Sequence, residues 1–501
     1  MRWFALLAVF WSFPALCAPD FTIGSKRFTE SYILAEIVKQ VADQTAETRA
    51  IHRQGLGNTG LVFAALKGGS IDLYPEYTGT IGQEVLKKNL TDLNSLNREL
   101  APLGLAAGIP LGFNNTYAFA MRDEQAERLG IRTVSDLARH PQLRFGLSQE
   151  FLERADGWPA VRKAYNLPFE RPRGLEHGLV YEAIATEQID VTDIYSTDAK
   201  INRYRLRVLE DDRKFFPAYD AVLLYRTDLP RQLPRTWAAL QKLEGRISAT
   251  KMIKMNAQAE LEGRPFAAIA GAFLAGTLDA DTGPPTRDFT SLLFGPDFVR
   301  LSGEHLMLVS VSLLFGVLVG VPLGIWAARV PGSAQPILSI VGIIQTVPSL
   351  ALLAFLIPLF RQIGTVPALV ALFLYSLLPI VRNTYTGLTD ISPSLRESAL
   401  ALGLPSFARL RLVELPLAAR TILAGVKTSA VINVGTATIA AFIGAGGFGE
   451  RIATGLALND NAILLAGAIP AAALALLVQT GFDLLDRGLV PEGLRESSTG
   501  K

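Results

Sequence analysis

Hydrophobic positions follow two different patterns along this chain of 501 residues. Up to about residue 290, short apolar runs alternate with stretches in which apolar residues recur at helical spacing, a pattern typical of α/β domains. Residues 21–23 predict a strand, and residues 32–41 predict a helix with one apolar face. The other predicted strands are 71–74, 143–146, 191–195, 207–209 and 221–224. We expect two lobes, joined by crossovers near residues 110–114 and 212–216.

The second pattern begins after residue 300 and consists of long apolar stretches. A hydrocarbon core of about 30 Å takes about 20 helical residues. The stretches that predict spans are 306–328, 336–360, 364–381, 421–443 and 462–482. Pro348, Pro358, Pro379 and Pro470 lie within them and predict kinks, which neighbouring helices can tolerate. We therefore expect an α/β domain followed by an all-α transmembrane domain of about five spans.

Composition agrees with this division and narrows the class of protein. Hydrophobic residues make up 50% of the chain and the mean hydropathy is +0.29, which excludes a disordered chain. The 48 Lys and Arg residues barely outnumber the 46 Asp and Glu residues, so no binding of nucleic acid is expected. The 4 histidines are scattered along the sequence. We therefore expect no metal site, no cofactor and no enzyme activity.

The first residues have the features of a secretory signal. Arg2 precedes an apolar run over residues 3–13, and Ala15 and Cys17 stand at the spacing of a signal-peptidase site. We expect cleavage near Ala18, with an uncleaved anchor as the alternative. Cleavage would leave the mature chain without a thiol. The expected divisions are a signal peptide at 1–17, an exported domain at 18–290 and a transmembrane domain at 296–490.

The distribution of arginines predicts the orientation of the spans. Residues 382–420, between the third and fourth predicted spans, carry five Arg residues against three acids. Positive residues flanking spans favour the cytoplasmic side, which places this loop in the cytoplasm. Counting spans from there puts the first domain outside the cytoplasm, as the signal also requires, and the C-terminus inside. We expect a multi-pass protein of the bacterial plasma membrane, with its first domain in the periplasm.

The same loop contains a spaced motif, with Glu-Ser-Ala at 397–399, glycine at 403 and Leu-Pro at 415–416. It resembles the EAA loop of ABC-transporter permeases, and residues 430–456 are similar to the osmoprotectant branch of that family. The resemblance implies a rigid knob of two short helices around a glycine turn, which couples the spans to a cytoplasmic ATPase. The residues that would carry this coupling are Glu397, Ala399, Gly403, Leu415 and Pro416. Because the sequence has no G-x-x-x-x-G-K-[ST] phosphate loop, ATP hydrolysis is expected from another subunit.

Motifs throughout the first domain resemble the substrate-binding proteins for glycine betaine and related quaternary ammonium compounds. They are GSKRFTESYILAEI from Gly24, LGNTG from Leu56, DLYPEYTGT from Asp72, NNTYAFAM from Asn114, QEFLER from Gln149, DIYSTDAKI from Asp193 and FPAYDAVLLYR from Phe216. The resemblance implies a two-lobed periplasmic-binding-protein fold of type II, with an aromatic box around the trimethylammonium group. The box residues would be Tyr77, Tyr117, Tyr195 and Tyr219. The partners of the ligand carboxylate would be Lys26, Thr80 and Arg154.

The physical logic of such a site can be stated from the residue types. A quaternary ammonium group has no N–H to donate, so aromatic faces hold it, at about 0.5–2 kcal/mol per contact. Lys26 and Arg154 can make charge-assisted hydrogen bonds to an anionic end. Glu150 is expected to orient Arg154 or a tyrosine. Asn115 stands where some relatives carry Asp, which makes the site slightly less acidic.

We therefore interpret the chain as a binding domain fused to a permease, in an ATP-driven importer of glycine betaine or a related osmoprotectant. Choline, carnitine, ergothioneine or an amino acid are the alternative cargoes. A ligand-sensing receptor is the alternative from another class, and it would require a cytoplasmic output domain. Since one permease domain offers half a pathway, two chains are expected to pair as a homodimer above two ATPase subunits.

Overall fold

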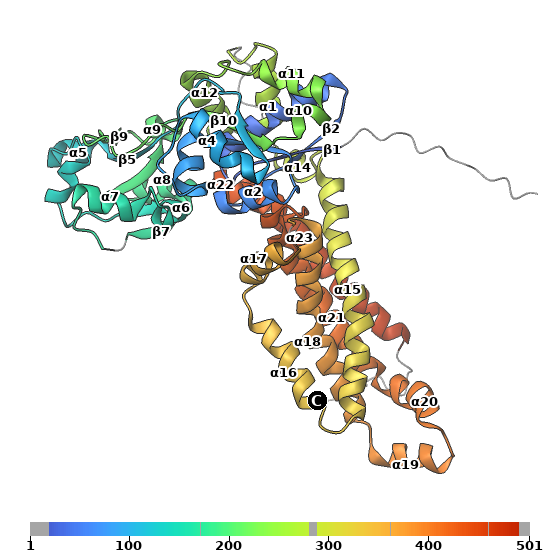
Figure 1. Cartoon of the computed structure of the whole chain (residues 1–501). Coiled ribbons are helices and arrows are strands. Elements are labelled where there is room, and N and C mark those ends of the chain that lie inside the picture. Colours follow the sequence, from blue (N-terminus) through green and yellow to red (C-terminus); the bar gives the residue numbers. More distant parts are fainter. Residues whose placement is uncertain (1–19, 171, 280–287, 361, 459, 490–501) are drawn as a thin grey trace, which may run out of the picture.

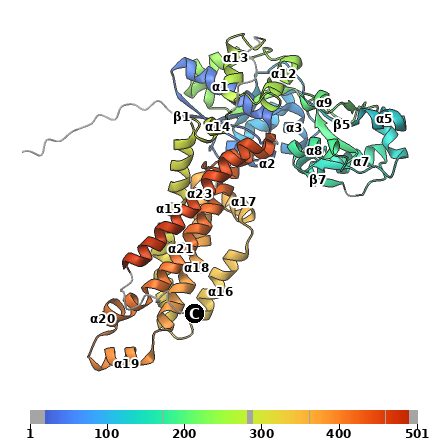
Figure 2. The same cartoon turned by 180° about the vertical axis from the view of Figure 1, so that it is seen from behind.

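The computed structural model describes residues 20–489, apart from 171, 280–287, 361 and 459. Two α/β lobes lie at one end of an elongated helical bundle, and the turn between α19 and α20 lies at the far end (Figure 1). Lobe 1 sits over the end of the bundle, whereas most of lobe 2 extends to one side, as the reverse view also shows (Figure 2). The predicted fold class is confirmed. The predicted signal peptide, with Cys17, lies outside the described residues.

Lobe 1 (residues 20–108 and 221–279) is built on a five-stranded sheet in the order β2-β1-β3-β10-β4. Strand β1 pairs in parallel with β2 and β3, and β10 is antiparallel to its neighbours β3 and β4. Its strands are β1 Asp20–Gly24, β2 Arg49–Arg53, β3 Leu73–Tyr77, β4 Leu105–Gly108 and β10 Ala221–Arg226. Its helices are α1 Thr29–Thr45, α2 Thr59–Lys67, α3 Thr78–Thr80, η1 Ile81–Val85, α4 Leu93–Leu100, η2 Ala101–Leu103, α10 Leu229–Gln232, α11 Pro234–Gln241, α12 Ala249–Glu260 and α13 Phe266–Leu274.

Lobe 2 (residues 117–208) repeats this arrangement. The sheet β8-β5-β9 continues into the pair β6-β7 through a parallel bridge between Phe145 and Val191. Its strands are β5 Tyr117–Arg122, β6 Gly146–Ser148, β7 Arg173–Leu175, β8 Val191–Tyr195 and β9 Leu206–Val208. Its helices are α5 Asp123–Leu129, η3 Ser135–Arg139, α6 Gln149–Glu153, α7 Trp158–Tyr165, α8 His177–Ala185 and α9 Lys200–Arg203.

Two neighbouring segments connect the lobes. The chain leaves lobe 1 after β4, returns before β10, and the two connections pair at a bridge between Asn114 and Asp220. The backbone N–H of Ala221 also donates to the Phe113 carbonyl at 3.0 Å. The predicted crossover near 110–114 is therefore confirmed. The second connection pairs with it at residues 219–220, after the predicted 212–216, because the N–H groups of Phe215 and Phe216 still donate to Asp211, whose carboxylate is bonded to Tyr165 of lobe 2. Paired connections of this kind form a hinge about which two lobes can close.

Several predicted strands match the observed ones and others are missing from the prediction. Strand β8 has the predicted bounds, β1 and β10 extend the predicted runs, and β9 is shifted by one residue. The strand predicted at 143–146 is wrong in position, because β6 begins at Gly146. Strand β3 likewise begins two residues later than predicted. The sequence patterns missed β2, β4, β5 and β7.

The bundle consists of long apolar helices, linked to lobe 1 through α14. Four helical segments are long and apolar enough to cross a membrane within the described residues, or five if one bent pair counts as a span. The elements are α14 Phe289–Leu293, α15 Phe298–Arg329, α16 Ala334–Thr346, α17 Ser349–Phe360, α18 Thr365–Thr389, α19 Pro393–Ala401, α20 Ser406–Arg409, the π-helix η4 Leu410–Glu414, α21 Leu415–Ala440, η5 Ala441–Ile443, α22 Gly449–Leu458 and α23 Asn461–Leu489.

The second predicted span, 336–360, is not a continuous helix. Helices α16 and α17 meet at an angle of 99°. Val347, which follows α16, is extended, with φ −68° and ψ 126°. Pro348 disfavours the helical conformation of the preceding residue and has no N–H to donate, so the helix ends here. The other predicted proline sites, Pro358, Pro379 and Pro470, lie inside helices.

Close packing of α15 on α18 forms the centre of the bundle. Gly316, Gly320 and Gly324 recur every fourth residue on α15 and are buried. A methyl group at Gly320 would lie 2.8 Å from Ile380 Cγ2, and one at Gly324 would lie 2.5 Å from Thr384 Cβ. Small residues let membrane helices approach each other closely where no hydrophobic effect drives their association.

Candidate functional site

Aromatic side chains gather where the two lobes meet. Tyr77 ends β3 in lobe 1, while Tyr117 at the start of β5 and Tyr195 at the end of β8 are paired across the sheet of lobe 2. The ring centroids of Tyr117 and Tyr195 are 5.1 Å apart, and those of Tyr117 and Tyr219 are 5.7 Å apart. Tyr117 therefore contacts two of the other three predicted box tyrosines directly.

A fifth ring, Phe28, connects Tyr77 with the other tyrosines. Its centroid is 6.4 Å from that of Tyr77 and 5.5 Å from that of Tyr195. Phe28 precedes α1 and belongs to the GSKRFTE motif, but the sequence interpretation gave it no role. The signal available in the sequence was an aromatic ring two residues after Lys26. A phenylalanine before a helix is, however, more often a packing residue. The aromatic site is thus a continuous group of five rings contributed by both lobes.

The phenols of this group are neutral and shielded from solvent. Tyr77 and Tyr117 are 5% and 6% exposed, and Tyr219 is 1% exposed. Burial raises the pKa of each of these hydroxyl groups, and at Tyr77 the neighbouring Glu30 raises it further. A neutral phenol keeps the π face and the O–H donor that an aromatic wall requires.

Lys26 and Arg154, the two predicted cations, lie against this aromatic group and are paired within the chain. Lys26 Nζ is 2.6 Å from Glu76 Oε1 and 5.0 Å from the centre of the Tyr77 ring. Arg154 makes two hydrogen bonds to Asp156, at 2.8 and 2.6 Å, and its guanidinium carbon is 5.2 Å from the centre of the Tyr117 ring. The protein's own cations therefore already contact two of the box tyrosines.

Thr80 and Glu150 complete the surroundings of Arg154. The guanidinium donates to Thr80 Oγ1 at 3.4 Å, and its third nitrogen lies 3.5 Å from Glu150 Oε1. Glu150 also accepts a hydrogen bond from Thr59 at 2.7 Å. The structure thus brings Lys26, Thr80 and Arg154 to the aromatic group, and Glu150 lies beside Arg154 as expected.

Glu30 is a buried carboxylate that joins the lobes, and the sequence interpretation missed it. It accepts hydrogen bonds from the Tyr77 hydroxyl and from Asn115 at 2.9 Å, Asn256 at 3.1 Å and Thr197 of the lobe 2 side at 2.6 Å. Burial raises the pKa of this carboxyl, although all four donors favour its charged form. Glu30 and Thr197 are 167 residues apart in the sequence, so no local pattern predicts their contact.

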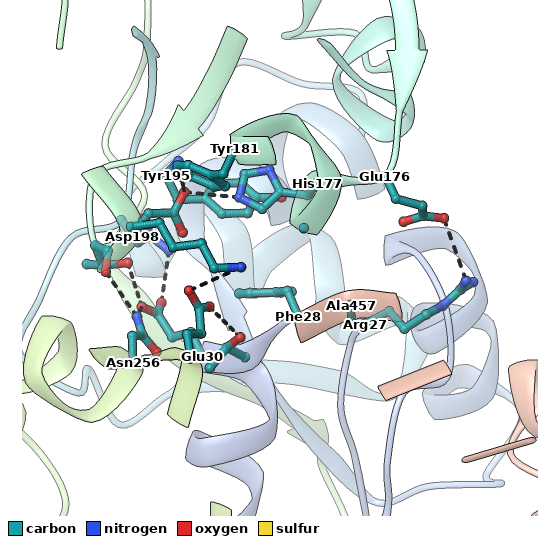
Figure 3. A pocket seen from close by; sticks show the side chains of 16 residues that line it. Arg27, Phe28, Glu30, Glu176, His177, Tyr181, Tyr195, Asp198, Asn256 and Ala457 are labelled. Atoms are coloured by element: carbon teal, nitrogen blue, oxygen red, sulfur yellow. Dashed lines mark hydrogen bonds and ion pairs between the residues drawn. The ribbon is translucent and has the colours of Figure 1, made fainter. Parts of the chain in front are cut away.

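A small enclosed cavity of about 20 Å³ adjoins the aromatic group (Figure 3). Phe28, Glu30 and Tyr195 line it from the side of the box, together with Asp198 and Ala457. The cavity can hold about one water molecule. Ala457 belongs to α22 of the bundle, so the bundle contributes to the wall of a cavity beside the aromatic group.

His177 connects this cavity with the box. Its ring stacks on Tyr195 with centroids 4.2 Å apart, and its Nε2 lies 3.0 Å from Asp198 Oδ2. Burial alone would lower the pKa of His177, but the Asp198 carboxylate and further acids hold it above the ordinary value. The same pair lowers the pKa of Asp198 against the opposing effect of burial. The His177–Asp198 pair therefore lies against the ring of Tyr195.

The other predicted site lies at the far end of the bundle, where α19, α20 and η4 form a projection that we name the far-end knob (residues 393–414; Figure 1). Gly403 has φ +73°, a conformation that favours glycine, and its N–H donates to Leu400 at 2.9 Å. Glu397 is exposed, while Ala399 is 3% exposed and packs inward. Leu415 and Pro416 begin α21 directly after the knob. The expected pair of short helices around a glycine turn is confirmed.

The knob is firmly attached to the spans but presents apolar side chains to its surroundings. Buried Glu414 accepts from Arg329 at 2.7 Å and from Arg409 at 3.1 Å, which ties the knob to the end of α15. The exposed apolar residues are Leu395, Leu400, Leu402, Phe407 and Leu412, and the exposed fractions of Leu402 and Phe407 are 79% and 71%. Apolar surface of this kind is typical of sites that contact a protein partner or a membrane.

Comparison with known proteins assigns each half of the chain to a family description. Residues 19–276 match the substrate binding domain of ABC-type glycine betaine transport systems. Residues 320–491 match the binding-protein-dependent transport system inner membrane component. Both matches agree with the resemblances drawn from the sequence motifs.

Individual relatives resemble either the bundle or the two lobes. The glycine betaine/carnitine/choline transport system permease protein OpuCB of Bacillus subtilis is 42% identical over 201 residues, which is 40% of this chain and 92% of that protein. The choline transport system permease protein OpuBB of the same organism is 45% identical over the same shares of both chains. A crystal structure of a glycine betaine/carnitine/choline ABC transporter is 32% identical and covers 51% of this chain and 98% of its own, with a TM-score of 0.44.

Proposed function

Because the chain belongs to the substrate-binding family of ABC-type glycine betaine transport systems and also to the permease family of binding-protein-dependent transporters, we propose that it takes up glycine betaine or a closely related quaternary ammonium compound. Family membership makes the chain a fused binding and permease subunit of an ABC importer. It is a transport subunit and not an enzyme, and its partner is an ATPase.

The observation that carries the proposed cargo is the group of five rings flanked by Lys26 and Arg154. A trimethylammonium cation is attracted by the ring faces of the box, and these faces already attract the cations of the chain. We propose that Tyr77, Tyr117, Tyr195 and Tyr219 surround the methylated cation, with Phe28 as a further wall.

Lys26, Thr80 and Arg154 are the proposed partners of the cargo carboxylate. Because Glu76 and Asp156 hold the two cations, a carboxylate must share or displace these partners. A carboxylate that shares Lys26 and Arg154 with these acids gains charge-assisted hydrogen bonds, and choline, which has no carboxylate, cannot gain them. This difference favours glycine betaine or carnitine over choline as the cargo, with ergothioneine and amino acids as further zwitterionic candidates.

The proposed orientation follows the sequence expectation. We propose that residues 18–290 lie in the periplasm after removal of the signal peptide 1–17, that the permease domain 296–490 spans the bacterial plasma membrane, and that the C-terminus lies in the cytoplasm. The far-end knob then faces the ATPase, and its exposed apolar residues support this assignment. Two chains are proposed to pair in the membrane as a homodimer.

Calorimetric titration of the full chain in lipid nanodiscs tests the proposed cargo. Glycine betaine, carnitine, choline, ergothioneine and proline form the panel of ligands. We expect glycine betaine or carnitine to bind at least about tenfold more tightly than choline, which corresponds to about 1.4 kcal/mol. Tightest binding of proline, which has no trimethylammonium group, would contradict the proposal.

A further inference from the structure

Glu30 differs from the other acids of the aromatic group in the charge of its partners. Glu76 is paired with Lys26, and Asp156 is paired with Arg154, so the charges of these two acids are compensated. Within the described residues, the donors to Glu30 are two hydroxyl groups and two amide groups, those of Tyr77, Thr197, Asn115 and Asn256. All four donors are neutral. A negative charge on Glu30 is therefore not compensated by the groups that bind it.

The hydrogen bonds of Glu30 are those of an ionised carboxylate, which accepts on both oxygens and has no hydrogen to donate. Its Oε1 accepts from Tyr77 and Asn115. Its Oε2 accepts from Thr197 and Asn256. The same nitrogen of Asn256 also donates to the Thr197 carbonyl at 3.0 Å, so the donor end of this amide faces the carboxylate. Glu30 also lies in the first turn of α1, where the helix dipole favours a negative charge.

This carboxylate adjoins the part of the aromatic group in which the rings already attract a cation. Glu30 is 2% exposed and accepts the hydroxyl hydrogen of Tyr77. It lines the enclosed cavity together with Phe28 and Tyr195 (Figure 3). Lys26 Nζ is 5.0 Å from the centre of the Tyr77 ring and 5.5 Å from that of the Phe28 ring. A buried negative charge is thus in direct contact with one wall of the proposed cation site.

A buried carboxylate in this position strengthens the attraction of a ring for a quaternary ammonium group. Such a group has no N–H to donate and responds to the electrostatic potential of its surroundings. A phenol that donates to a carboxylate is polarised by it, so its ring face becomes more negative. The carboxylate also attracts the cation directly, and this attraction is stronger in a buried site than in water.

We propose that Glu30 is the counter-ion of the methylated cation, and that it acts through Tyr77 to make the site select a cation over a neutral group of the same shape. Glu30 is then a positioning residue for charge and does not itself have to touch the cargo. This inference rests on the proposed function and adds to it the residue that sets the charge selectivity of the site.

A neutral analogue of glycine betaine tests the selectivity directly. tert-Butylacetate has the same shape and the same carboxylate, with carbon in place of the cationic nitrogen. Glu30→Gln keeps the size of the side chain and removes its charge. Both ligands are titrated calorimetrically against the full chain in nanodiscs, with tert-butylacetate also measured in competition with glycine betaine. We expect Glu30→Gln to weaken glycine betaine at least about tenfold, whereas tert-butylacetate keeps its affinity or binds more tightly.

The ratio of the two affinities separates a role in charge from a role in structure. Loss of the fold or of lobe closure would weaken both ligands alike, and a parallel weakening would overturn the inference. Asp72→Asn is the matched control. Asp72 is another acid of lobe 1, which accepts from the backbone N–H of Thr22 at 2.8 Å. It lies before β3, at the opposite end of the strand from Tyr77 and about 16 Å from it, so the ratio should not change.

Exchange of the acid and the amide provides a rescue. Asn115 donates to Glu30 at 2.9 Å, so Glu30→Gln combined with Asn115→Asp moves the carboxylate across one hydrogen bond and keeps the total charge. We expect this double variant to bind glycine betaine at least about fivefold more tightly than Glu30→Gln alone. Normal binding of tert-butylacetate without this recovery would contradict the proposed role.

Tyr77→Phe tests whether the effect passes through the tyrosine. This variant keeps the ring and removes the hydroxyl that joins it to Glu30. In the Tyr77→Phe background, Glu30→Gln should therefore change the ratio of the two affinities less than it does in the parent. An equal change in both backgrounds would show that Glu30 does not act through Tyr77. Failure of the proposed cargo would appear separately, as lack of binding of every methylated amine by the parent chain.

Discussion

The cleft between the lobes and the far-end knob differ in how their functional side chains are partnered. In the cleft, Lys26 and Arg154 are 6% and 3% exposed and are paired with acids of the same chain. In the knob, Glu397 is exposed and five large apolar side chains have no cover within the described residues. A buried, internally paired site suits a small ligand that replaces existing contacts. An exposed apolar site suits a protein partner that supplies the missing contacts.

The largest expected effect is a loss of transport without a loss of cargo binding, when the glycine turn of the far-end knob is disrupted. Gly403→Pro forces φ from +73° toward about −65° and removes the N–H that donates to Leu400, so the turn cannot form. We expect uptake and cargo-stimulated ATP hydrolysis to fall to background while glycine betaine still binds, and Glu397→Ala to act in the same direction. Uptake into proteoliposomes and calorimetry measure the two functions.

Gly403→Asn is the matched control, because Asn tolerates the left-handed conformation better than other residues do. It should retain a large part of the uptake. Loss of ligand binding in Gly403→Pro would show that the two sites are not separable and would contradict the comparison.

The second effect concerns one end of the cargo. Arg154→Ala removes a charge-assisted bond worth about 1.5–3 kcal/mol and should weaken glycine betaine by about 10- to 150-fold. Choline should be affected much less, since it has no carboxylate. The ratio of the two affinities is the readout, because any structural effect of leaving Asp156 unpaired weakens both ligands alike. If the ratio of the two affinities does not change, Arg154 does not bind the carboxylate of the ligand.

The third effect concerns the other end of the cargo. Tyr195→Ala should weaken every trimethylammonium ligand by about 1–2 kcal/mol, whereas Tyr195→Phe and Tyr195→Trp keep the aromatic face and should be better tolerated. Phe28→Ala should act in the same direction. Tyr204→Ala, in lobe 2 but outside the group of five rings, is the control. Equal affinities in the parent and in all four box Tyr→Ala variants would show that the ligand binds elsewhere.

The smallest effect is a dependence of stability on pH. The pKa of His177 is held above its ordinary value by Asp198, so the protonated histidine stabilises the fold below about pH 6.5. This stabilisation is lost as the pH rises through the folded-state pKa. Scanning calorimetry from about pH 6 to about pH 9 should show a larger decrease in the melting temperature of the lobes for the parent than for His177→Gln. Identical pH profiles would contradict a charged pair behind Tyr195.

The sequence predicted those parts of the site that local patterns or motifs describe. Strand β8 and its terminal Tyr195 followed from an apolar run, but β2 reads Arg-Ala-Ile-His-Arg and gave no signal. Phe28 and Glu30 escaped because they act through contacts with Tyr195 and Thr197, which depend on how the lobes close. The sequence predicted a kink at Pro348 and not a break between two helices, because a sequence pattern does not give the angle at which two helical segments meet. The backbone of Gly178 in α8 lies directly against the Ala457 carbonyl of α22, and this contact between lobe 2 and the bundle had no local signal in the sequence.

Labelling of single cysteines tests most directly the central claim, that the cargo site and the ATPase site lie on opposite faces of the membrane. Asp123 in lobe 2 and Ser406 in the far-end knob are both exposed. Cys17 is the only cysteine of the chain. Labelling of the parent protein therefore measures the background signal that Cys17 contributes. In intact spheroplasts, an impermeant thiol reagent should label Asp123→Cys and leave Ser406→Cys unlabelled until the membrane is permeabilised. Equal labelling of both variants in intact spheroplasts would contradict the account.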